Sequence, residues 1–526
     1  MLGIDASALA LFAVFCCLLY VYRRNTWAKA PYAHLPLPPS RKGYPLIGNL
    51  LEMPTEFEWK TYHQWSKELD TDILHVNIAG TNIIVLDKFE VANELFEKRS
   101  SIYSGRAHSV MMIDLMGWDF HFAFSDYGVR RRRRLMHYNF HPTATMRFRP
   151  KLVKAARNLL ARFLDTPDDV IGNVKYMAGE VIMSITYGIN IQPKDDPYIN
   201  AAEKGVFPVT IAAVPGSFLV DTISVLKYVP EWVPGASFKT KAREWKKLAR
   251  HMVEAPFAAT KKMMAEGTYP PSVVSESLEK ASELADRDDA YREDNIEDVA
   301  GAMYTSGGDT TTSAMASCIL GLLERPDILR KAQKQLDDVL KPGHLPDFED
   351  EPSLSYITAI VMETLRWRDV VPIAVPHLLS VDDEYRGYRL PKGSIIIANS
   401  WQVNRAMLHD EEVYPDASAF KPERFLHDDG SLNKSVRNPA HACWGFGRRI
   451  CPGRYMAFSQ IWIAVASLLA VYDIKKAVDS NGRVIEPSHE YVSALICTPK
   501  PFKCSITPRS KDAEALIRSA SSQDVY

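Results

Sequence analysis

Cys451 lies in a run of residues that could bind a large, flat cofactor. The run reads Trp444-Gly445-Phe446-Gly447-Arg448-Arg449-Ile450-Cys451-Pro452-Gly453. Glycines let a backbone adopt positive φ and approach a ligand without a Cβ in the way. Pro452 suits the first position of a helix, whose dipole would favour a thiolate at Cys451. The cation of Arg449 could bind a carboxylate on whatever covers the sulfur. A single thiolate ligand in this setting indicates a haem iron.

This run resembles the haem-binding loop of cytochrome P450 enzymes, usually written FGxGxRxCxG, with Trp444 where phenylalanine is usual. The resemblance implies that Cys451 is the axial ligand of the iron of haem b. It also implies that the cofactor is held by Arg449, Trp444, Gly445 and Gly453. For this loop alone, the alternative is a buried, inert cysteine in a Gly-rich turn.

A second segment, Ser306-Gly307-Gly308-Asp309-Thr310-Thr311, lies in an apolar stretch from Glu297 to Leu323 that predicts a buried central helix. Adjacent glycines within a helix cost about 1 kcal/mol each relative to alanine, so they indicate close approach to a ligand or a local opening of the helix. At such an opening Thr310 could hold water or oxygen, and Asp309 could deliver protons from solvent. The segment resembles the family's AGxDTT motif, with Ser306 at its first position. A glycine-kinked helix with a capped acid is the alternative.

Glu363 and Arg366 are spaced i and i+3 on a predicted helix with apolar flanks, which predicts a buried ion pair. The run Pro422-Glu423-Arg424-Phe425 offers Arg424 as a second cation for the same network. These segments resemble the family's ExxR and PERF motifs. The resemblance implies that Glu363, Arg366 and Arg424 form a structural triad behind the haem, with a role in folding rather than in chemistry.

The stretch from Val129 to Met136 departs from the family pattern. After Tyr127-Gly128 the family usually has a tryptophan, followed four residues on by an arginine, and both lie near a haem propionate. Here the stretch has consecutive arginines from Arg130 to Arg134, no tryptophan, and too few residues. The register taken from Leu135-Met136 matches Arg133 to the propionate-binding arginine. A solvated basic face or an error in the gene model is the alternative, and a basic helix would also suit docking of an acidic electron donor.

The N-terminal region predicts a membrane anchor. Residues from Ala6 to Tyr22 are almost entirely apolar, and about 17 such residues are the short end of a bilayer-spanning helix. Arg23 and Arg24 follow this stretch, so the N-terminus should face the lumen and the rest of the chain the cytosol. A cleaved signal peptide is the alternative. We expect a single-pass anchor in the endoplasmic reticulum membrane over residues 1–24 and a stiff, Pro-rich hinge over residues 25–48.

Composition is compatible with one large globular body. The chain has 526 residues, of which 46% are hydrophobic, and its net charge of -1 gives no argument for nucleic-acid binding. Seven scattered cysteines without a C-x-x-C pair fit a reducing compartment. Helical patterns dominate, with short strands expected near residues 72–86, 384–398 and 491–507. We expect a mainly α fold with small β-sheets, the cytochrome P450 fold, over residues 49–508, and a polar, disordered tail over residues 509–526.

Variable apolar segments are expected to line the substrate pocket. By resemblance to the family these are Met111–Ser125, Val371–Val375 and Val492–Leu495, together with the central helix near Ala302. An apolar pocket implies a hydrophobic substrate of modest size. The segment Phe218–Trp232 has the aromatic, apolar composition of a loop that dips into a membrane surface, although core packing would explain it equally well.

The resemblance covers roughly residues 35 to 505 and is to fungal microsomal members of natural-product pathways. It implies a haem-thiolate monooxygenase that inserts one atom of O₂ into an apolar small molecule, for which a terpenoid or other secondary metabolite is the best expectation. Electrons would come from NADPH through NADPH-cytochrome P450 reductase, since no nucleotide-binding loop is present. The alternatives are a rearranging or dehydrating haem-thiolate enzyme, an oxygenase of an aromatic or indole substrate, and a haem- or steroid-binding module without catalysis.

Overall fold

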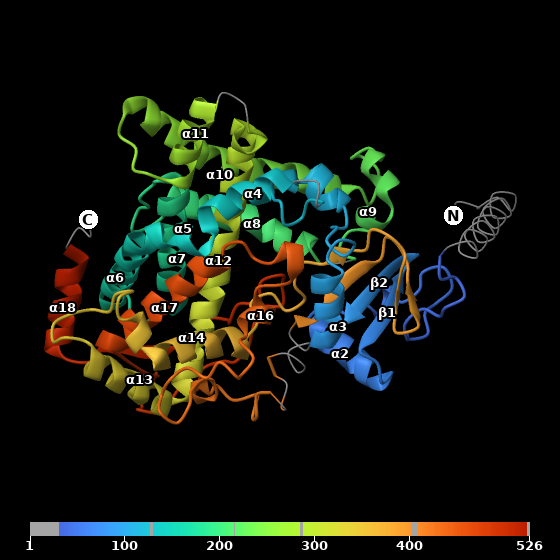
Figure 1. Cartoon of the computed structure of the whole chain (residues 1–526). Helices are drawn as coiled ribbons and strands as arrows, with labels where there is room; N and C mark the ends of the chain where they lie inside the picture. The colour runs from blue at the N-terminus through green and yellow to red at the C-terminus, as the bar shows by residue number, and fades with distance from the viewer. Residues whose placement is uncertain are drawn as a thin grey trace, which may run out of the picture.

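The protein is mostly helical, and the sheet that contains β1 and β2 is set to one side (Figure 1). In that view β1, β2, α2 and α3 form the right-hand part, and α12 runs through the middle of the helical part. The predicted class, mainly α with small β-sheets, is confirmed. The anchor expected over residues 1–24 lies outside the described residues. The computed structural model describes residues 31–522, apart from 127–129, 215, 285–287, 401–407, 410 and 412.

Helices make up most of the described part of the chain. In chain order they are α2 (Glu58–Glu68), α3 (Phe89–Asn93), α4 (Arg130–Phe140), α5 (Pro142–Thr145), α6 (Arg149–Asp165), α7 (Val170–Tyr187), α8 (Pro197–Ala212), α9 (Leu219–Thr222), α10 (Ser237–Glu266), α11 (Val273–Leu284), α12 (Glu293–Glu324), α13 (Pro326–Val339), α14 (Ser355–Trp367), α16 (Ala440–Cys443), α17 (Arg454–Val471) and α18 (Lys511–Ser522).

The largest sheet of the described residues has the strand order β1-β2-β6-β3. The short strands predicted near residues 72–86 are present as the hairpin of β1 and β2, whose turn is Ala79-Gly80, both with positive φ. The segment Tyr491–Cys497 forms no strand and contributes only an isolated bridge from Tyr491 to Pro499, so that expectation is wrong. The strands are β1 (Ile73–Ile78), β2 (Thr81–Leu86), β3 (His377–Leu378), β4 (Asp383–Tyr385), β5 (Tyr388–Leu390), β6 (Ile395–Ala398), β7 (Tyr472–Lys476) and β8 (Cys504–Pro508).

Helix α12 is the predicted central helix, and it is buried nearly all round because other helices cover it on several sides. It packs most extensively against α7. A Cβ on Gly307 would lie 2.8 Å from Ile182 of α7, so this glycine allows the two helices to approach closely. The helix is continuous through Gly307 and Gly308, and the local opening expected there is absent from the described backbone.

Helix α17 is also apolar on all sides. Among the described helices it is the one long and apolar enough to cross a membrane, but 67% of its apolar window is buried inside the protein. It contacts α6, α13 and α14, and it directly follows the Cys451 loop. It is therefore a core helix that supports the loop from behind.

The Pro-rich segment is part of the globular body where it is described. The carbonyl oxygen of Pro36 accepts a 2.8 Å hydrogen bond from the backbone N–H of Arg389, and that of Pro39 accepts one of 2.8 Å from His75. Tyr44 and Gly48 form a bridge, and Gly48 also bridges to β1. The second half of the predicted hinge is thus attached to the sheets instead of acting as a free spacer.

The C-terminal tail is ordered over most of its length, so the prediction of a disordered tail is wrong for residues 511–522. Helix α18 packs against α6, and its Ile517 side chain is completely buried. The apolar residues Ala513, Leu516, Ile517 and Ala520 recur at helical spacing and form one face. The helix was not predicted because the tail is polar overall and its apolar face is short.

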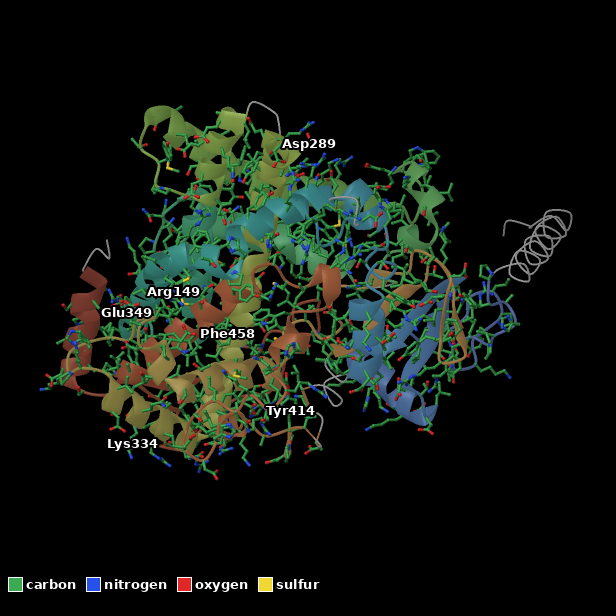
Figure 2. The ribbon with its side chains drawn as sticks, in the orientation of Figure 1. Arg149, Asp289, Lys334, Glu349, Tyr414 and Phe458 are labelled. Atoms are coloured by element: carbon green, nitrogen blue, oxygen red, sulfur yellow. The ribbon has the colours of Figure 1, made fainter. Side chains whose placement is uncertain are left out.

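The predicted ion pairs of Glu363 are present and buried. Glu363 and Arg366 have no exposed side-chain surface, and their charged atoms are 2.6 Å apart. The Nε atom of Arg424 lies 3.2 Å from the same carboxylate, and the backbone N–H of Lys421 donates to it at 2.7 Å. Tyr414, labelled in Figure 2, lies with its ring 5.5 Å from the Arg366 guanidinium. Glu363 therefore connects α14 to the chain segment that leads toward Cys451.

Replacing this carboxylate tests its structural role. Glu363→Gln would leave two arginines buried without their counter-charge, so we expect a loss of about 3–5 kcal/mol in the free energy of unfolding. Denaturant titration of the full chain measures the loss. Glu514→Gln, which breaks the exposed pair with Arg518, is the control and should change stability by less than about 0.5 kcal/mol. Equal effects of the two substitutions would contradict a structural role for Glu363.

Candidate active site

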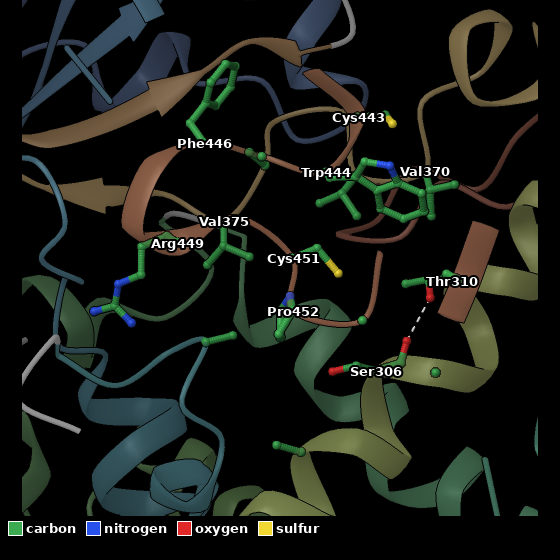
Figure 3. A pocket seen from close by; sticks show the side chains of 18 of the residues that line it. Ser306, Thr310, Val370, Val375, Cys443, Trp444, Phe446, Arg449, Cys451 and Pro452 are labelled. Carbon is green, nitrogen blue, oxygen red and sulfur yellow. Dashed lines mark hydrogen bonds between the residues drawn. The ribbon is translucent and has the colours of Figure 1, made fainter. Parts of the chain in front are cut away.

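A cavity of about 310 Å³ lies between α12 and the loop that carries Cys451. In Figure 3 the Cys451 sulfur points toward the side of the cavity where Thr310 lies, and Arg449 lies on the other side of Cys451. The cavity wall includes Thr310 and all the residues that the sequence predicts to hold a cofactor, namely Cys451, Arg449, Arg133, Trp444, Gly445 and Gly453. Asp309 is outside the wall.

Glycines shape the Cys451 loop in two different ways. Gly447 has φ +50°, and a Cβ on it would lie 2.1 Å from the carbonyl oxygen of Phe96, so only glycine permits this contact. A Cβ on Gly445 or Gly453 would meet nothing within 4 Å. These two glycines therefore leave open space on the cavity side of the loop, as a flat ligand against the backbone requires.

The sulfur of Cys451 lies in a buried environment with nearby N–H groups. Helix α17 begins at Arg454, so Pro452 is not at the first helical position and that prediction is wrong. The backbone N–H groups of Gly453 and Arg454 nevertheless point at the sulfur. Burial raises the pKa of the Cys451 thiol, whereas these N–H groups and the cations of Arg133 and Arg454 act in the opposite direction. A bound metal would add to the groups that favour the thiolate.

Positive charge converges on one side of the cavity. Arg449 donates hydrogen bonds to the backbone carbonyls of Ser104, Phe122 and Ser125, at 2.8, 3.1 and 3.0 Å. Arg133 donates to the carbonyl of Ile450, next to Cys451. All these acceptors are neutral oxygens.

Arg106 and His377 join this side of the cavity, and sequence reasoning did not select either of them. Arg106 donates to the carbonyls of Ala123 and Val375 at 2.7 and 2.9 Å. Burial, followed by the nearby cations of Arg449 and Arg133, holds the pKa of Arg106 well below its usual value. A carboxylate placed among these side chains would relieve their mutual repulsion. The residues of the cavity wall therefore fit a haem: Cys451 would hold its iron, and Arg106, Arg133 and Arg449 would bind its propionates.

The arginines from Arg130 to Arg134 do not form one solvated face. Arg132 pairs with Asp298 of α12 and has only 12% of its side chain exposed. Arg133 lines the cavity. Arg134 pairs with Asp288. Arg130, Arg131 and Arg134 are exposed, so a partner protein could reach these three members of the run.

The predicted proton-relay residues lie on different sides of α12. The Thr310 hydroxyl donates a 2.7 Å hydrogen bond to the carbonyl of Ser306, drawn as the dashed line in Figure 3. Asp309 lies near Lys175 of α7 and Glu203 of α8, and burial raises its pKa. Lys175 and Glu203 form a 2.7 Å ion pair and are 33% and 48% exposed. Asp309 thus lies between a residue of the cavity wall and a pair in contact with solvent.

Comparison with known proteins agrees with this site. The family model for cytochrome P450 matches residues 38–506. The chain belongs to the cytochrome P450 family. The matched range begins inside the predicted Pro-rich hinge and ends just before α18.

Fungal cytochrome P450 enzymes are similar over nearly the full chain. The protein is 45% identical to cytochrome P450 monooxygenase 98 of Postia placenta, over 98% of this chain and 97% of that relative. It is 42% identical to cytochrome P450 monooxygenase ple1 of Rhodocybe pseudopiperita, over 92% and 91%. It is 40% identical to tryptamine 4-monooxygenase of Psilocybe cyanescens, over 90% and 94%. Membership implies an oxidoreductase that uses haem and O₂, receives electrons from a reductase and acts on a small molecule.

The substrate-facing wall of this cytochrome P450 is only partly where the sequence places it. Phe122 of the segment 111–125 lines the cavity, as do Val371, Val375 and Ala302. The segment Val492–Leu495 contributes nothing to the cavity, so that expectation is wrong, and Val492 is 46% exposed. The remaining wall on the α12 side is chiefly apolar.

If the arginines bind the haem propionates, removing one of their charges should speed the dissociation of haem from the cytochrome P450. Arg106→Gln keeps a hydrogen-bond donor but removes a buried charge, and a hydrogen bond to a charged group contributes about 1.5–3 kcal/mol. We therefore expect haem to dissociate about tenfold faster or more. Transfer of haem to an excess of apomyoglobin measures the rate. Arg386→Gln, a change at a half-exposed surface arginine, should leave the rate unchanged, and the same rate in Arg106→Gln would contradict the assignment.

Proposed function

We propose that the protein is a haem-thiolate monooxygenase that hydroxylates, or oxidises in a related way, an apolar secondary metabolite such as a terpenoid. The observation that carries the proposal is the placement of Cys451 and Thr310 in the wall of one cavity, with Asp309 behind Thr310 toward solvent. In the balanced reaction R–H, O₂, NADPH and H⁺ give R–OH, H₂O and NADP⁺. NADPH-cytochrome P450 reductase would deliver the two electrons.

Each residue has a defined task in this mechanism. Haem b, when bound, supplies the activation of O₂. Cys451 would be its axial ligand, and the arginine side of the cavity would orient it through its propionates. Thr310 would hold a proton donor beside the oxygen, and Asp309 would renew that proton from the side of Lys175 and Glu203. The apolar wall would exclude bulk water from the reacting carbon.

A rearranging or dehydrating enzyme is the weaker alternative because it has no use for Asp309 and Thr310. Oxygenation of an indole is the alternative that a relative supports, since the chain is 40% identical to a tryptamine 4-monooxygenase. Among the described residues of the cavity wall, Asp369 is the one carboxylate, whereas three arginines line the wall, Arg106, Arg133 and Arg449. This charge balance favours a neutral, apolar substrate over an amine cation.

The proposal is tested with membranes that carry the full chain and a reductase. Reduced, CO-bound protein should show the red-shifted band of thiolate-ligated haem, and Cys451→Ser should lose it. Terpene candidates and tryptamine are incubated separately with NADPH under ¹⁸O₂. The true substrate should gain the mass of one labelled oxygen atom, and the other compounds should not. Product formed without NADPH or without label would instead support a rearranging enzyme.

Thr310→Val provides a further arm of the same test. Loss of the hydroxyl should reduce product per NADPH severalfold and divert the electrons to hydrogen peroxide, since general acid catalysis contributes about 10²–10⁴-fold. Thr312→Val is the matched control: its hydroxyl makes the same kind of bond, to the carbonyl of Gly308 at 2.9 Å, but it does not line the cavity. Equal coupling in both variants would contradict a proton role for Thr310.

We further propose a single-pass protein of the endoplasmic reticulum membrane, with the catalytic body on the cytosolic side. Large apolar side chains are exposed around α9 and in the segment before α2, both on the right in Figure 1. Exposed large apolar side chains gathered in two such regions are typical of an interaction site. The exposed residues include Leu46, Leu51, Phe207, Leu219, Ile223, Val225, Tyr228 and Trp232.

Contact of this surface with lipid is measured through Trp232, which is 83% exposed. In vesicles containing brominated lipid we expect quenching of its fluorescence, so Trp232→Phe should remove part of the lipid-dependent quenching of the full chain. Trp245→Phe, a change at a partly buried side chain of α10, is the control and should remove little of it. If the lipid-dependent quenching of Trp232→Phe equals that of the unaltered chain, Trp232 does not contact lipid and the proposal for this surface is wrong.

A further inference from the structure

His121 and Ser306 form a hydrogen-bonded polar pair in the largely apolar, substrate-facing wall of the cavity. The Nε2 atom of His121 lies 3.1 Å from the Oγ atom of Ser306, which belongs to α12 and is labelled in Figure 3. Both residues line the cavity. The ring is 6% exposed, whereas Ser306 is exposed to the open space. His121 comes from the loop after Phe120, so the pair joins two distant parts of the chain.

The hydrogen-bond directions within the pair follow from the neighbouring backbone. The Nδ1 atom of His121 accepts a 3.2 Å hydrogen bond from the N–H of Ala123, so the ring proton is on Nε2. Burial lowers the pKa of His121 to about 4, so the ring is neutral near pH 7. The Nε2–H group therefore donates to the Ser306 oxygen. The hydroxyl proton of Ser306 is left to be donated to another acceptor.

The described residues offer the Ser306 proton no acceptor of their own, because the hydroxyl's hydrogen bond within this part of the chain is the one to His121. The nearby Thr310 hydroxyl is itself a donor, to the carbonyl of Ser306. A hydroxyl facing apolar surroundings without an acceptor costs free energy, and serine is also a poorer helix former than alanine. A bound molecule that brings an acceptor would remove this cost.

We propose that the His121–Ser306 pair recognises a carbonyl or hydroxyl oxygen on an otherwise apolar substrate. The proposal rests on the monooxygenase function and narrows its substrate class to apolar molecules that already carry an oxygen. His121 orients the serine, and Ser306 donates to the substrate oxygen. Because α12 fixes the position of Ser306 relative to Thr310, the contact also selects which carbon lies near the reacting centre. An earlier oxidation or hydration must then supply the substrate.

Two probes of nearly equal shape separate this recognition from simple apolar binding. The probes are 2-adamantanone, which has an acceptor oxygen, and 2-methyleneadamantane, which has none. Each is titrated into the full-length, haem-loaded protein, and the dissociation constants are read from the haem absorption or from displacement of a bound azole. The measured quantity is the ratio of the constant for the alkene to that for the ketone, compared between variants so that differences in probe hydrophobicity cancel.

One hydrogen bond should change this ratio by about 3- to 10-fold. Ser306→Ala should lower it by that factor and leave the constant for the alkene nearly unchanged. His121→Phe should lower the ratio in the same direction, and His121→Gln, which retains an N–H donor, should restore it. Thr305→Val, which removes a neighbouring α12 hydroxyl that does not line the cavity, is the matched control.

The proposal is overturned if Ser306→Ala leaves the ratio unchanged, including the case in which both probes bind more weakly by the same factor. The pair would then have only a packing role. Ser306→Cys has a similar volume but only a weak hydrogen-bond donor, so it should lower the ratio as Ser306→Ala does. It replaces the alanine variant in the test if that variant fails to hold haem. Failure of the monooxygenase function is seen separately, as a missing thiolate–haem band or missing ¹⁸O incorporation. The binding ratio needs neither electrons nor O₂.

Discussion

The carboxylate of Glu363 is the interaction on which the position of the active-site loop depends. It holds two arginines at complete or nearly complete burial, and a buried carboxylate of this kind requires several donors at once. The same arginines donate to the carbonyls of Leu408, Ala419 and Pro415. The described residues between Leu408 and Phe425 are therefore held to α14 by charge-assisted hydrogen bonds, and helix α17 supports the Cys451 loop from behind.

Within the cavity, three kinds of surface are kept apart. Cations gather where a cofactor carboxylate would lie, Cys451 lies in a loop whose Gly445 and Gly453 leave open space, and the α12 side combines apolar side chains with the hydroxyls of Ser306, Thr310 and Thr311. This separation gives a flat, amphipathic cofactor one favourable orientation, because reversing it would place its carboxylates against apolar side chains. On the α12 side it leaves a substrate few polar groups to bind, namely the hydroxyls of Ser306, Thr310 and Thr311.

Features that depend on local spacing could be predicted from the sequence, and features made by distant segments could not. The hairpin at Ala79, the buried pair of Glu363 with Arg366 and the central helix follow from patterns a few residues long. Arg106, His121 and His377 reach the cavity from separate loops, and nothing in their own neighbourhoods shows this. Helix α18 was hidden for the opposite reason, because four apolar positions in a polar tail give a weak signal.

The geometry of one helix explains why recognition and proton supply do not interfere. Ser306 and Thr310 are four residues apart, so they share a face of α12 and both reach the cavity. Asp309 is rotated by about 100° from Thr310, which directs it toward Lys175 and Glu203. A substrate oxygen bound at Ser306 would therefore lie on a different side of α12 from the proposed route through Asp309. Any insertion within this turn would rotate one function away from the cavity, so the spacing of Ser306, Asp309 and Thr310 has to be kept as a unit.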